Sequence, residues 1–269
     1  MRIVLITDEV SPDVAEAVRF ARAHGVQEIA IRAVSDQAIL ALDEAAIDAL
    51  VACVSDLGAP VSSLLSPLFK AYLPGRSGPR LVDPNIPEFS VDASVHLAAR
   101  ERLPPLAERL GTDCVRVFSF LRERGAEAGL PDEARDLLAA LEQSRPNLYA
   151  VENEDSCTVG SVEELERCVL ETGLRAILDP ANDWYLRRAP VAPRIRPVLV
   201  ERVADVHVKD MAGDTVVPLG DGDVDWPAIL ARLGELGYAG TFTLEPHLER
   251  DRDGVARSIE ALRQLAGAL

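Results

Sequence analysis

Cysteine, histidine and positive charge are all scarce in this chain of 269 residues. Its four cysteines are widely spaced and form no Cys-x-x-Cys pair, which argues against a zinc knuckle and favours buried, reduced thiols. Lysine and arginine number 28 against 44 acidic residues, so the formal charge is −16. A chain this acidic repels nucleic-acid phosphates, and no long basic run offsets the repulsion. We therefore expect no nucleic-acid partner.

Long apolar runs are also missing. No stretch approaches the ~18 consecutive apolar residues that indicate a membrane helix, and the first residues lack the apolar core of a signal peptide. We expect no membrane partner and a cytoplasmic location. The composition is nevertheless 48% hydrophobic, which is enough for a sizeable core.

The clearest repeated pattern is a helical stretch, a glycine and then a strand. Glycine supplies the left-handed conformation that closes many helices. Together with three further strand-like segments, the pattern gives eight strand–helix units, and it recurs at Gly25, Gly58, Gly111, Gly173 and Gly237. Eight such units in about 250 residues predict an α/β fold, a (β/α)₈ TIM barrel, as a single domain over residues 1–269. An open, doubly wound sheet is the alternative.

Four strand-like segments in the second half of the chain each end in a side chain of the kind that binds metals. In a closed barrel these ends meet at one rim, which is where the active sites of barrels lie. Three carboxylates close together are costly without a cation, and with an imidazole they make a hard-to-borderline metal site. The pattern predicts one divalent ion (Mn, Mg, Co or Zn). The segments are residues 148–152, 175–179, 203–207 and 241–245, and they end at Glu152, Asp179, His207 and Glu245.

Each of these residues also has a plainer explanation. A glutamate at a strand end is often a salt-bridge partner, Asp179 before a proline suits a turn, and a lone histidine such as His207 is usually structural. Strand alternation does permit the site, because Asp205, His207 and Lys209 share one face of their strand. The joint occurrence at four strand ends favours the metal site over four separate explanations.

Six further residues are candidate substrate contacts because they fall near the same rim. Lys209 could bind a substrate oxygen or pair with Asp205 or Asp210, and Glu9 could instead cap the helix that follows it. Trp184 could stack on a substrate. The set is Glu9, Lys70, Asn182, Trp184, Lys209 and His247.

The segment after the third strand, residues 66–90, is long and rich in proline and glycine. Such loops are usually functional or disordered. Because this one leaves the predicted rim, we expect it to cover the substrate pocket as a lid. Lys70 within it could reach an anionic substrate group, whereas a solvated lysine is the plainer interpretation.

Seven stretches, taken in order, carry a family resemblance: residues 8–11, 115–120, 151–154, 178–182, 206–210, 217–226 and 244–247. The set resembles the sugar phosphate isomerase/epimerase family, also called xylose isomerase-like barrels, over nearly the whole chain. The resemblance implies a divalent metal held by Glu152, Asp179, His207 and Glu245. It also implies that Glu152 and Glu245 serve as acid and base. One departure is Asn182, which stands where many epimerases of the family carry a histidine.

We therefore expect a metal-dependent isomerase or epimerase of a sugar or polyol that acts through an enediolate. One glutamate would remove the proton beside the carbonyl and the other would return it. A dehydratase or lyase on a sugar-like substrate is the alternative, and a catalytically silent barrel is another. The abasic-site nucleases of the same superfamily fit poorly, because they need several zinc ions and more histidines. A homo-oligomer is left open.

Overall fold

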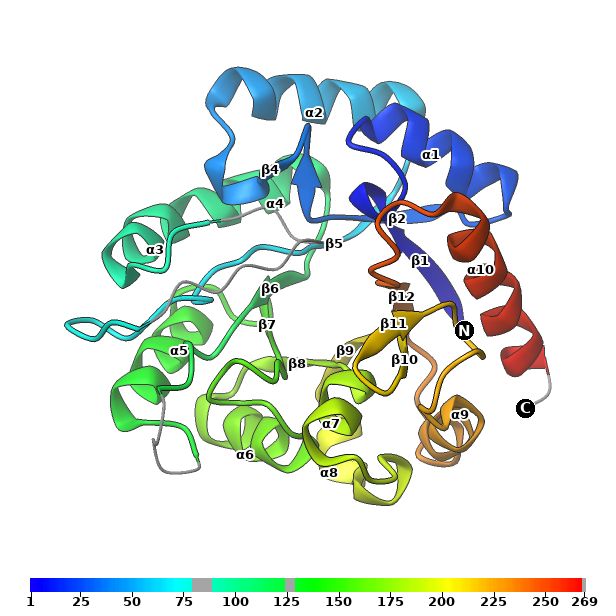
Figure 1. The fold of residues 1–269 in the computed structure, drawn as a ribbon. Helices are drawn as coiled ribbons and strands as arrows, with labels where there is room; N and C mark the ends of the chain where they lie inside the picture. The colour runs from blue at the N-terminus through cyan, green and yellow to red at the C-terminus, as the bar shows by residue number, and fades with distance from the viewer. Residues whose placement is uncertain (79–88, 124–128, 268–269) are drawn as a thin grey trace.

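Parallel strands form a closed barrel at the centre of the protein, whose computed structural model describes residues 1–78, 89–123 and 129–267 (Figure 1). The order around the ring is β1-β12-β9-β8-β7-β6-β5-β2. The strands are β1 (Arg2–Ile6), β2 (Glu28–Ile31), β5 (Val61–Leu64), β6 (Val115–Val117), β7 (Tyr149–Glu152), β8 (Arg175–Leu178), β9 (Val203–Val208) and β12 (Thr241–Leu244). The TIM barrel expected from the sequence is confirmed, and the open sheet is excluded.

Helices surround the barrel as an outer ring (Figure 1). Each longer helix buries one apolar face against the strands, as the 3.6-residue period requires; α1, for example, buries Val14, Ala17, Val18 and Ala21. The helices are α1 (Val14–Ala23), α2 (Glu44–Leu57), α3 (Ala93–Ala99), α4 (Leu103–Leu110), α5 (Asp132–Ser144), α6 (Val162–Thr172), α7 (Pro180–Arg187), α8 (Pro197–Val200), α9 (Trp226–Glu235) and α10 (Arg252–Gly267). Short 3-10 turns are η1 (Thr7–Glu9), η2 (Ile39–Ala41), η3 (Arg100–Arg102) and η4 (Ala192–Arg194). Among the described residues, no helix is both long and apolar enough to cross a membrane.

Local signals in the sequence fix where these helices begin and end. Ser161 and Glu164 form a reciprocal capping box at the start of α6. Gly173 then ends that helix in the left-handed conformation, with a φ of 81°. These two signals fix the length of α6, so that the chain leaves the helix directly before the start of β8.

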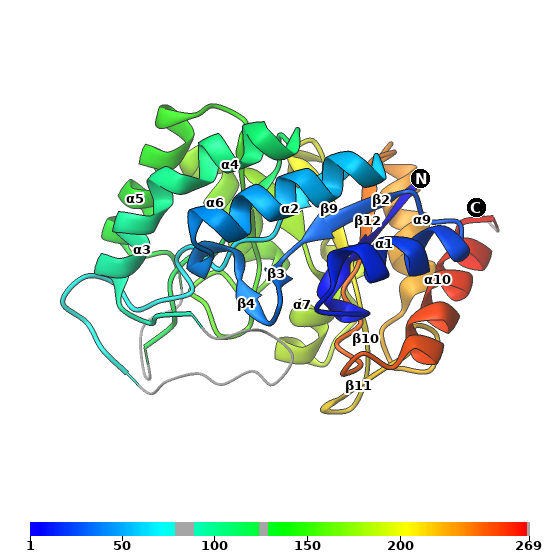
Figure 2. The same cartoon turned by 90° about the horizontal axis from the view of Figure 1, so that it is seen from above.

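Two short antiparallel hairpins within the described chain were not expected from the sequence. They are β3 (Ala33–Val34) with β4 (Gln37–Ala38), and β10 (Asp210–Ala212) with β11 (Thr215–Val217). Each follows the carboxyl end of a barrel strand, and both lie toward the same side of the barrel in Figure 2. The Asp210 carboxylate accepts backbone N–H groups from Gly220, Gly222 and Val224, which ties the second hairpin to the following turn.

The first part of the predicted lid is packed chain rather than a free loop. Backbone N–H groups of Phe118, Phe120 and Leu121 donate to carbonyls of residues 68, 69 and 71 at 2.8–3.0 Å. Leu68 and Phe69 are fully buried there. This stretch therefore extends the wall of the barrel beside β6. Residues 79–88 of the predicted lid lie outside the described residues.

Two apolar clusters make up most of the core. A small apolar cluster fills the barrel interior, and a much larger one lies between the strands and the helices. Ala150 belongs to the interior cluster and precedes Glu152 by two residues, so the glutamate faces the same interior nearer the carboxyl rim. The other members of the interior cluster are Val4, Ile6, Ala30, Leu65, Cys114 and Ile177.

Candidate metal and substrate site

The four ligand-type residues predicted from strand ends come together in the structure. One ligand atom from each lies within 4.8 Å of those of the others, and all four side chains are buried. Two ligands on opposite sides of one ion are separated by about 4.0–4.4 Å when each bond is 2.0–2.2 Å long. The spacing therefore suits a single ion after small side-chain movements. The residues are Glu152 at the end of β7, Asp179 after β8, His207 in β9 and Glu245 after β12.

His207 holds the centre of this cluster. Its Nδ1 atom lies 2.9 Å from Glu152 Oε1 and 3.1 Å from Glu245 Oε2. Burial opposes a charged imidazole, but the two carboxylates outweigh it and raise the pKa of His207 well above its ordinary value. Burial likewise opposes ionisation of Glu245, yet His207 holds the pKa of Glu245 well below its usual range.

Asp179 is set by the strand that precedes it and the helix that follows. Its side chain caps α7 by accepting the Asn182 backbone N–H, and its own N–H donates to Asn153 Oδ1 at 2.8 Å. The second carboxylate oxygen lies 2.7 Å from Lys209 Nζ. Burial raises the pKa of Asp179 to about 6, although Lys209 lowers it. Aspartate before proline thus serves both as a turn residue and as a member of the cluster.

Two buried arginines that were not selected from the sequence neutralise the cluster. Arg116 of β6 places Nη1 3.0 Å from Glu152 Oε2 and 3.3 Å from Glu245 Oε1. Arg32, the first residue after β2, places Nη1 3.1 Å from Glu245 Oε1. Each is only 2% exposed. Their signal in the sequence is an arginine inside or directly after an apolar strand, where a charge is costly unless it is paired.

The donor set fits a divalent cation. Three carboxylates and one imidazole nitrogen converge on a common point, and oxygen-rich ligation with one imidazole suits Mn, Mg, Co or Zn. The Nδ1 atom of His207 lies between two carboxylates, which is where a positive charge is best stabilised. Glu152, Asp179, His207 and Glu245 are the residues that would hold the ion.

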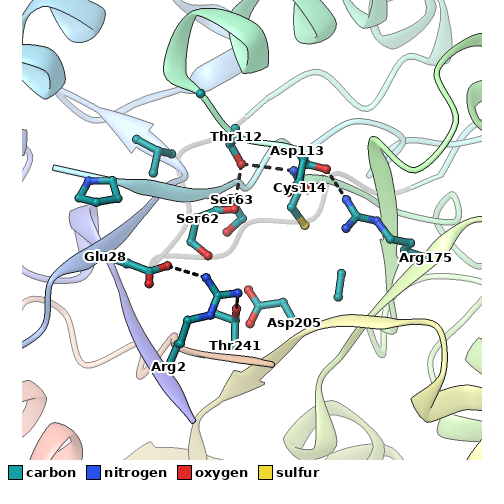
Figure 3. A pocket seen from close by; sticks show the side chains of 14 residues that line it. Arg2, Glu28, Ser62, Ser63, Thr112, Asp113, Cys114, Arg175, Asp205 and Thr241 are labelled. Carbon is teal, nitrogen blue, oxygen red and sulfur yellow. Dashed lines mark hydrogen bonds and ion pairs between the residues drawn. The ribbon is translucent and has the colours of Figure 1, made fainter. Parts of the chain in front are cut away.

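A cavity of about 220 Å³ opens onto this cluster at the carboxyl ends of the strands. Its polar lining includes Arg116, Glu154, Asp155, Asn182, Lys209, Asp214, Glu245 and His247, and its apolar lining is Phe118, Tyr185, Met211 and Val216. A larger cavity of about 670 Å³ lies at the opposite end, among the first residues of the strands (Figure 3). The smaller cavity is the candidate substrate site, because it is the one that reaches the ligand cluster and lies at the catalytic end of the barrel.

Three predicted substrate contacts line the smaller cavity: Asn182, Lys209 and His247. The Asn182 side-chain amide donates to Asn153 O at 2.9 Å and to Glu154 Oε2 at 3.2 Å, which fixes its orientation. Burial lowers the pKa of His247 well below its ordinary value, although the nearby Glu245 carboxylate raises it. Lys209 Nζ lies 2.7 Å from Asp179 Oδ2 and 4.0 Å from Glu245 Oε2, so it pairs with neither Asp205 nor Asp210, the two aspartates considered from the sequence.

Lys70 and Glu9 lie at the edge of the site. Lys70 Nζ lies 3.0 Å from Glu154 Oε1 and 5.0 Å from the Phe118 ring centroid, so it is an ion-paired rim residue rather than a solvated lysine. Glu9 lies 2.7 Å from Arg32 and accepts the His247 backbone N–H. The helix after Glu9 is capped by Asp13, so Glu9 holds the arginine instead of capping that helix.

Trp184 is not placed to stack on a molecule in the smaller cavity. Its ring is not part of the lining of that cavity; it packs against the outer core, and the Arg188 guanidinium lies 4.6 Å from the rings of both Trp184 and Tyr185. The next residue of α7, Tyr185, lines the cavity instead. Neighbouring residues of a helix point about 100° apart, so only one of the two faces the cavity.

Comparison with known proteins decides the family. The model of the xylose isomerase-like TIM barrel family matches residues 18–265. The chain belongs to this family. Among curated relatives of this xylose isomerase-like barrel, the rhizopine catabolism protein MocC of Rhizobium meliloti is 31% identical over a match that covers 31% of each chain. That match therefore spans less than a third of the relative's length.

Solved structures share the fold of this xylose isomerase-like barrel along nearly its full length. The IolI protein with a bound zinc atom has a TM-score of 0.77 at 14% identity, covering 100% of this chain and 99% of its own. The probable 3-DHS dehydratase AsbF of Bacillus anthracis has a TM-score of 0.74 at 15% identity, with 98% and 99% covered. The D-allulose 3-epimerase of Methylomonas sp., in complex with D-allulose, has a TM-score of 0.71 at 16% identity, with 98% and 96% covered.

Proposed function

We propose that this barrel is a divalent-metal-dependent isomerase or epimerase of a sugar or polyol. The observation that carries the proposal is the buried cluster of Glu152, Asp179, His207 and Glu245 beside a small polar cavity. When bound, the ion would polarise the substrate carbonyl and its neighbouring hydroxyl and stabilise the charge of an enediolate. Structural neighbours named for sugar epimerisation and for zinc binding support the proposal.

Glu152 and Glu245 are the acid/base pair in this proposal. Glu245 lines the cavity, so its carboxylate is placed to accept a proton from a bound substrate. Arg116 contacts both glutamates through one nitrogen and holds them in a fixed relation. If one glutamate removes a proton from one face and the other returns it to the opposite face, the product is an epimer. Return by the same group gives carbonyl migration.

Lys209 and Asn182 bind substrate oxygens in the same proposal. Lys209 brings a buried ammonium to the cavity, and interaction with Asp179 and neighbouring carboxylates raises its pKa against the effect of burial, so it stays charged. The two N–H groups of the Asn182 amide already donate to Asn153 O and Glu154 Oε2, so Asn182 offers its side-chain carbonyl oxygen to a substrate hydroxyl, in the place where the resemblance implies an imidazole in many epimerases. The Glu154 carboxylate, held by Lys70 and Asn182, offers an acceptor to a substrate hydroxyl.

The test is exchange of a substrate hydrogen with solvent. Protein purified without chelator and loaded separately with Mn²⁺, Mg²⁺, Co²⁺ or Zn²⁺ is incubated in deuterated water with ketoses, aldoses, their phosphates and oxidised cyclic polyols. Proton NMR should show deuterium entering at the carbon beside the carbonyl of the true substrate. A product lighter by one water would establish the dehydratase alternative instead, because isomerisation leaves the mass unchanged.

Variants Glu152→Gln and Glu245→Gln keep the shape of each side chain but remove the base. Each should lose about 100-fold or more in turnover, and Glu201→Gln, at an exposed glutamate outside the site, should not. Metal content must be measured for each variant, because these residues would also hold the ion. Full turnover by both metal-loaded glutamine variants would refute the acid/base assignment.

A further inference from the structure

One nitrogen of His207 points away from the ligand cluster. Nε2 is buried and has no hydrogen-bond partner among the described residues. The Asp205 carboxylate lies beside it, with Oδ2 3.9 Å from Nε2. Asp205 precedes His207 by two residues on β9, so both side chains face the barrel interior, one level apart. Asp205 is itself only 2% exposed.

The Asp205 carboxylate is held in place by the neighbouring strand. Thr243 of β12 is paired in register with His207, and its hydroxyl donates to Asp205 Oδ2 at 2.6 Å. The other oxygen, Oδ1, is buried without a partner in the described structure. Asp205 also lines the 670 Å³ cavity at the amino-terminal end, beside Thr241 (Figure 3). It therefore stands between the imidazole and an open space, with room for the carboxylate to adjust.

The chemistry of a bound ion gives this carboxylate a role. A neutral imidazole carries one proton, so if Nδ1 offers its lone pair to an ion, the proton must be on Nε2. In the structure Nδ1 faces the two glutamates, so it is the nitrogen that would bind. The Nε2 proton then needs an acceptor in the barrel interior. A movement of about 1 Å brings the Asp205 carboxylate to the ~2.9 Å of a normal hydrogen bond.

We propose that Asp205 is a positioning residue that accepts the Nε2 proton of His207 and thereby fixes the imidazole with Nδ1 directed at the divalent ion. Thr243 orients the carboxylate for this task. Metal-ligating histidines generally donate their second N–H to such a partner, and loss of the partner typically weakens metal binding by about 10- to 100-fold. This inference rests on the proposed function only in that it requires the ion to bind at the cluster.

The first measurement is ion affinity, by calorimetry or by competition with a chelating dye for Zn²⁺ and Mn²⁺. Asp205→Ala should weaken binding by about 10- to 100-fold. Asp205→Asn keeps a carbonyl acceptor and should recover part of the loss, and Thr243→Val should cause a smaller loss than Asp205→Ala. The matched control is Ser63→Ala. Ser63 lines the same cavity with a buried hydroxyl that has no hydrogen-bond partner in the described part of the chain, so this change should leave the affinity as it is.

The second measurement separates positioning from a merely structural effect. In ¹⁵N-labelled, zinc-loaded protein, long-range ¹⁵N–¹H spectra should show His207 with the proton on Nε2, and that proton should exchange slowly with water. In Asp205→Asn the exchange should be faster while the rest of the spectrum keeps its dispersion. This variant also carries the test if Asp205→Ala does not fold.

The outcomes separate this inference from the proposed function. Wild-type affinity in both Asp205 variants, with unchanged His207 signals, overturns the role of Asp205 and leaves the metal site standing. Wild-type protein that binds none of the ions overturns the metal site, and this inference falls with it. Equal losses in the Ser63 control would show that any change in the amino-terminal cavity disturbs the barrel, and would also overturn the inference.

Discussion

The two halves of the barrel contribute different chemistry to one site. Strands β7, β8, β9 and β12 of the second half carry or precede all four members of the ligand cluster. The first half contributes no member of that cluster; instead it supplies Arg32 and Arg116, whose guanidinium groups pair with the glutamates. The comparison teaches that the two glutamates are neutralised by arginines from the other half of the chain, whereas Asp179 is paired with Lys209 of its own half. A search for ligand-type residues alone therefore misses both arginines.

The largest effect on stability is expected from removing the positive charge of Arg116, a residue of the first half. Arg116→Met leaves Glu152 and Glu245 short of a buried partner, so metal-free protein should lose about 3–5 kcal/mol of unfolding free energy. A divalent ion should restore part of this loss, because it binds the folded state and supplies the missing charge. Urea titrations in the presence of chelator measure the loss of unfolding free energy, and titrations in the presence of the ion measure how much of it is restored. Arg135→Met, which breaks an exposed pair with Asp132, should cost about 0–1 kcal/mol. If the Arg116 variant unfolds like the control, the arginine does not neutralise the cluster.

The next effect concerns a second-half ligand. His207→Ala removes the imidazole that both glutamates contact, so Zn²⁺ affinity should fall by more than about 100-fold, beyond the loss typical of an outer partner. His24→Ala, at the end of α1, is the matched control and should bind as the wild type does. Calorimetry measures the Zn²⁺ affinity of both variants, and circular dichroism confirms that both are folded. Retained affinity in the His207 variant would place the ion elsewhere.

The smallest expected effect is a pH dependence of the unfolding free energy that is caused by Glu9, a residue of the first half. Burial raises the pKa of Glu9 from 4.5 to about 7, although Arg32 lowers it. Between these values the folded protein holds a proton that the unfolded chain has released. Stability from this group is therefore fully present below pH 4.5 and is lost as the pH rises toward 7.

Unfolding free energies in chelator should show this loss. From pH 4.5 to 7, wild type should lose about 2 kcal/mol more than Glu9→Gln. Glu201→Gln, at an exposed position, should follow the wild-type curve. Parallel curves for wild type and Glu9→Gln would show that Glu9 titrates in the same way in both states.

The eight strands and the four converging residues could be predicted because local sequence carries their signals. Glycines close helices, strands alternate, and ligand-type residues sit at strand ends. The arginines could not be assigned, because nothing near Arg116 shows that its partners lie 36 and 129 residues away. The predicted salt-bridge partners of Lys209 were wrong for a related reason. Asp205 lies four residues along an extended strand, or about 13 Å, and so cannot pair with it, whereas Asp179 arrives from the adjacent strand.

The short hairpins were missed because segments of two or three residues carry too little periodicity to predict a strand. The position of Trp184 was misjudged for a different reason. The sequence places it near the rim, but its direction depends on how α7 is rotated against the barrel, and that is set by tertiary packing. Tyr185, one residue on, has the favourable direction.

The pairing of β1 with β12 has a consequence for the order in which the protein assembles. This pairing joins the first and last strands of the ring. Two hydrogen bonds of the site link the two ends of the chain: Arg32 donates to Glu245, 213 residues away, and the His247 backbone N–H donates to Glu9, 238 residues away. A growing chain therefore cannot assemble the four-residue cluster until β12 has emerged and the ring has closed. Contacts this distant close late and slowly. The time at which high-affinity ion binding appears during refolding would thus report the time at which the ring closes.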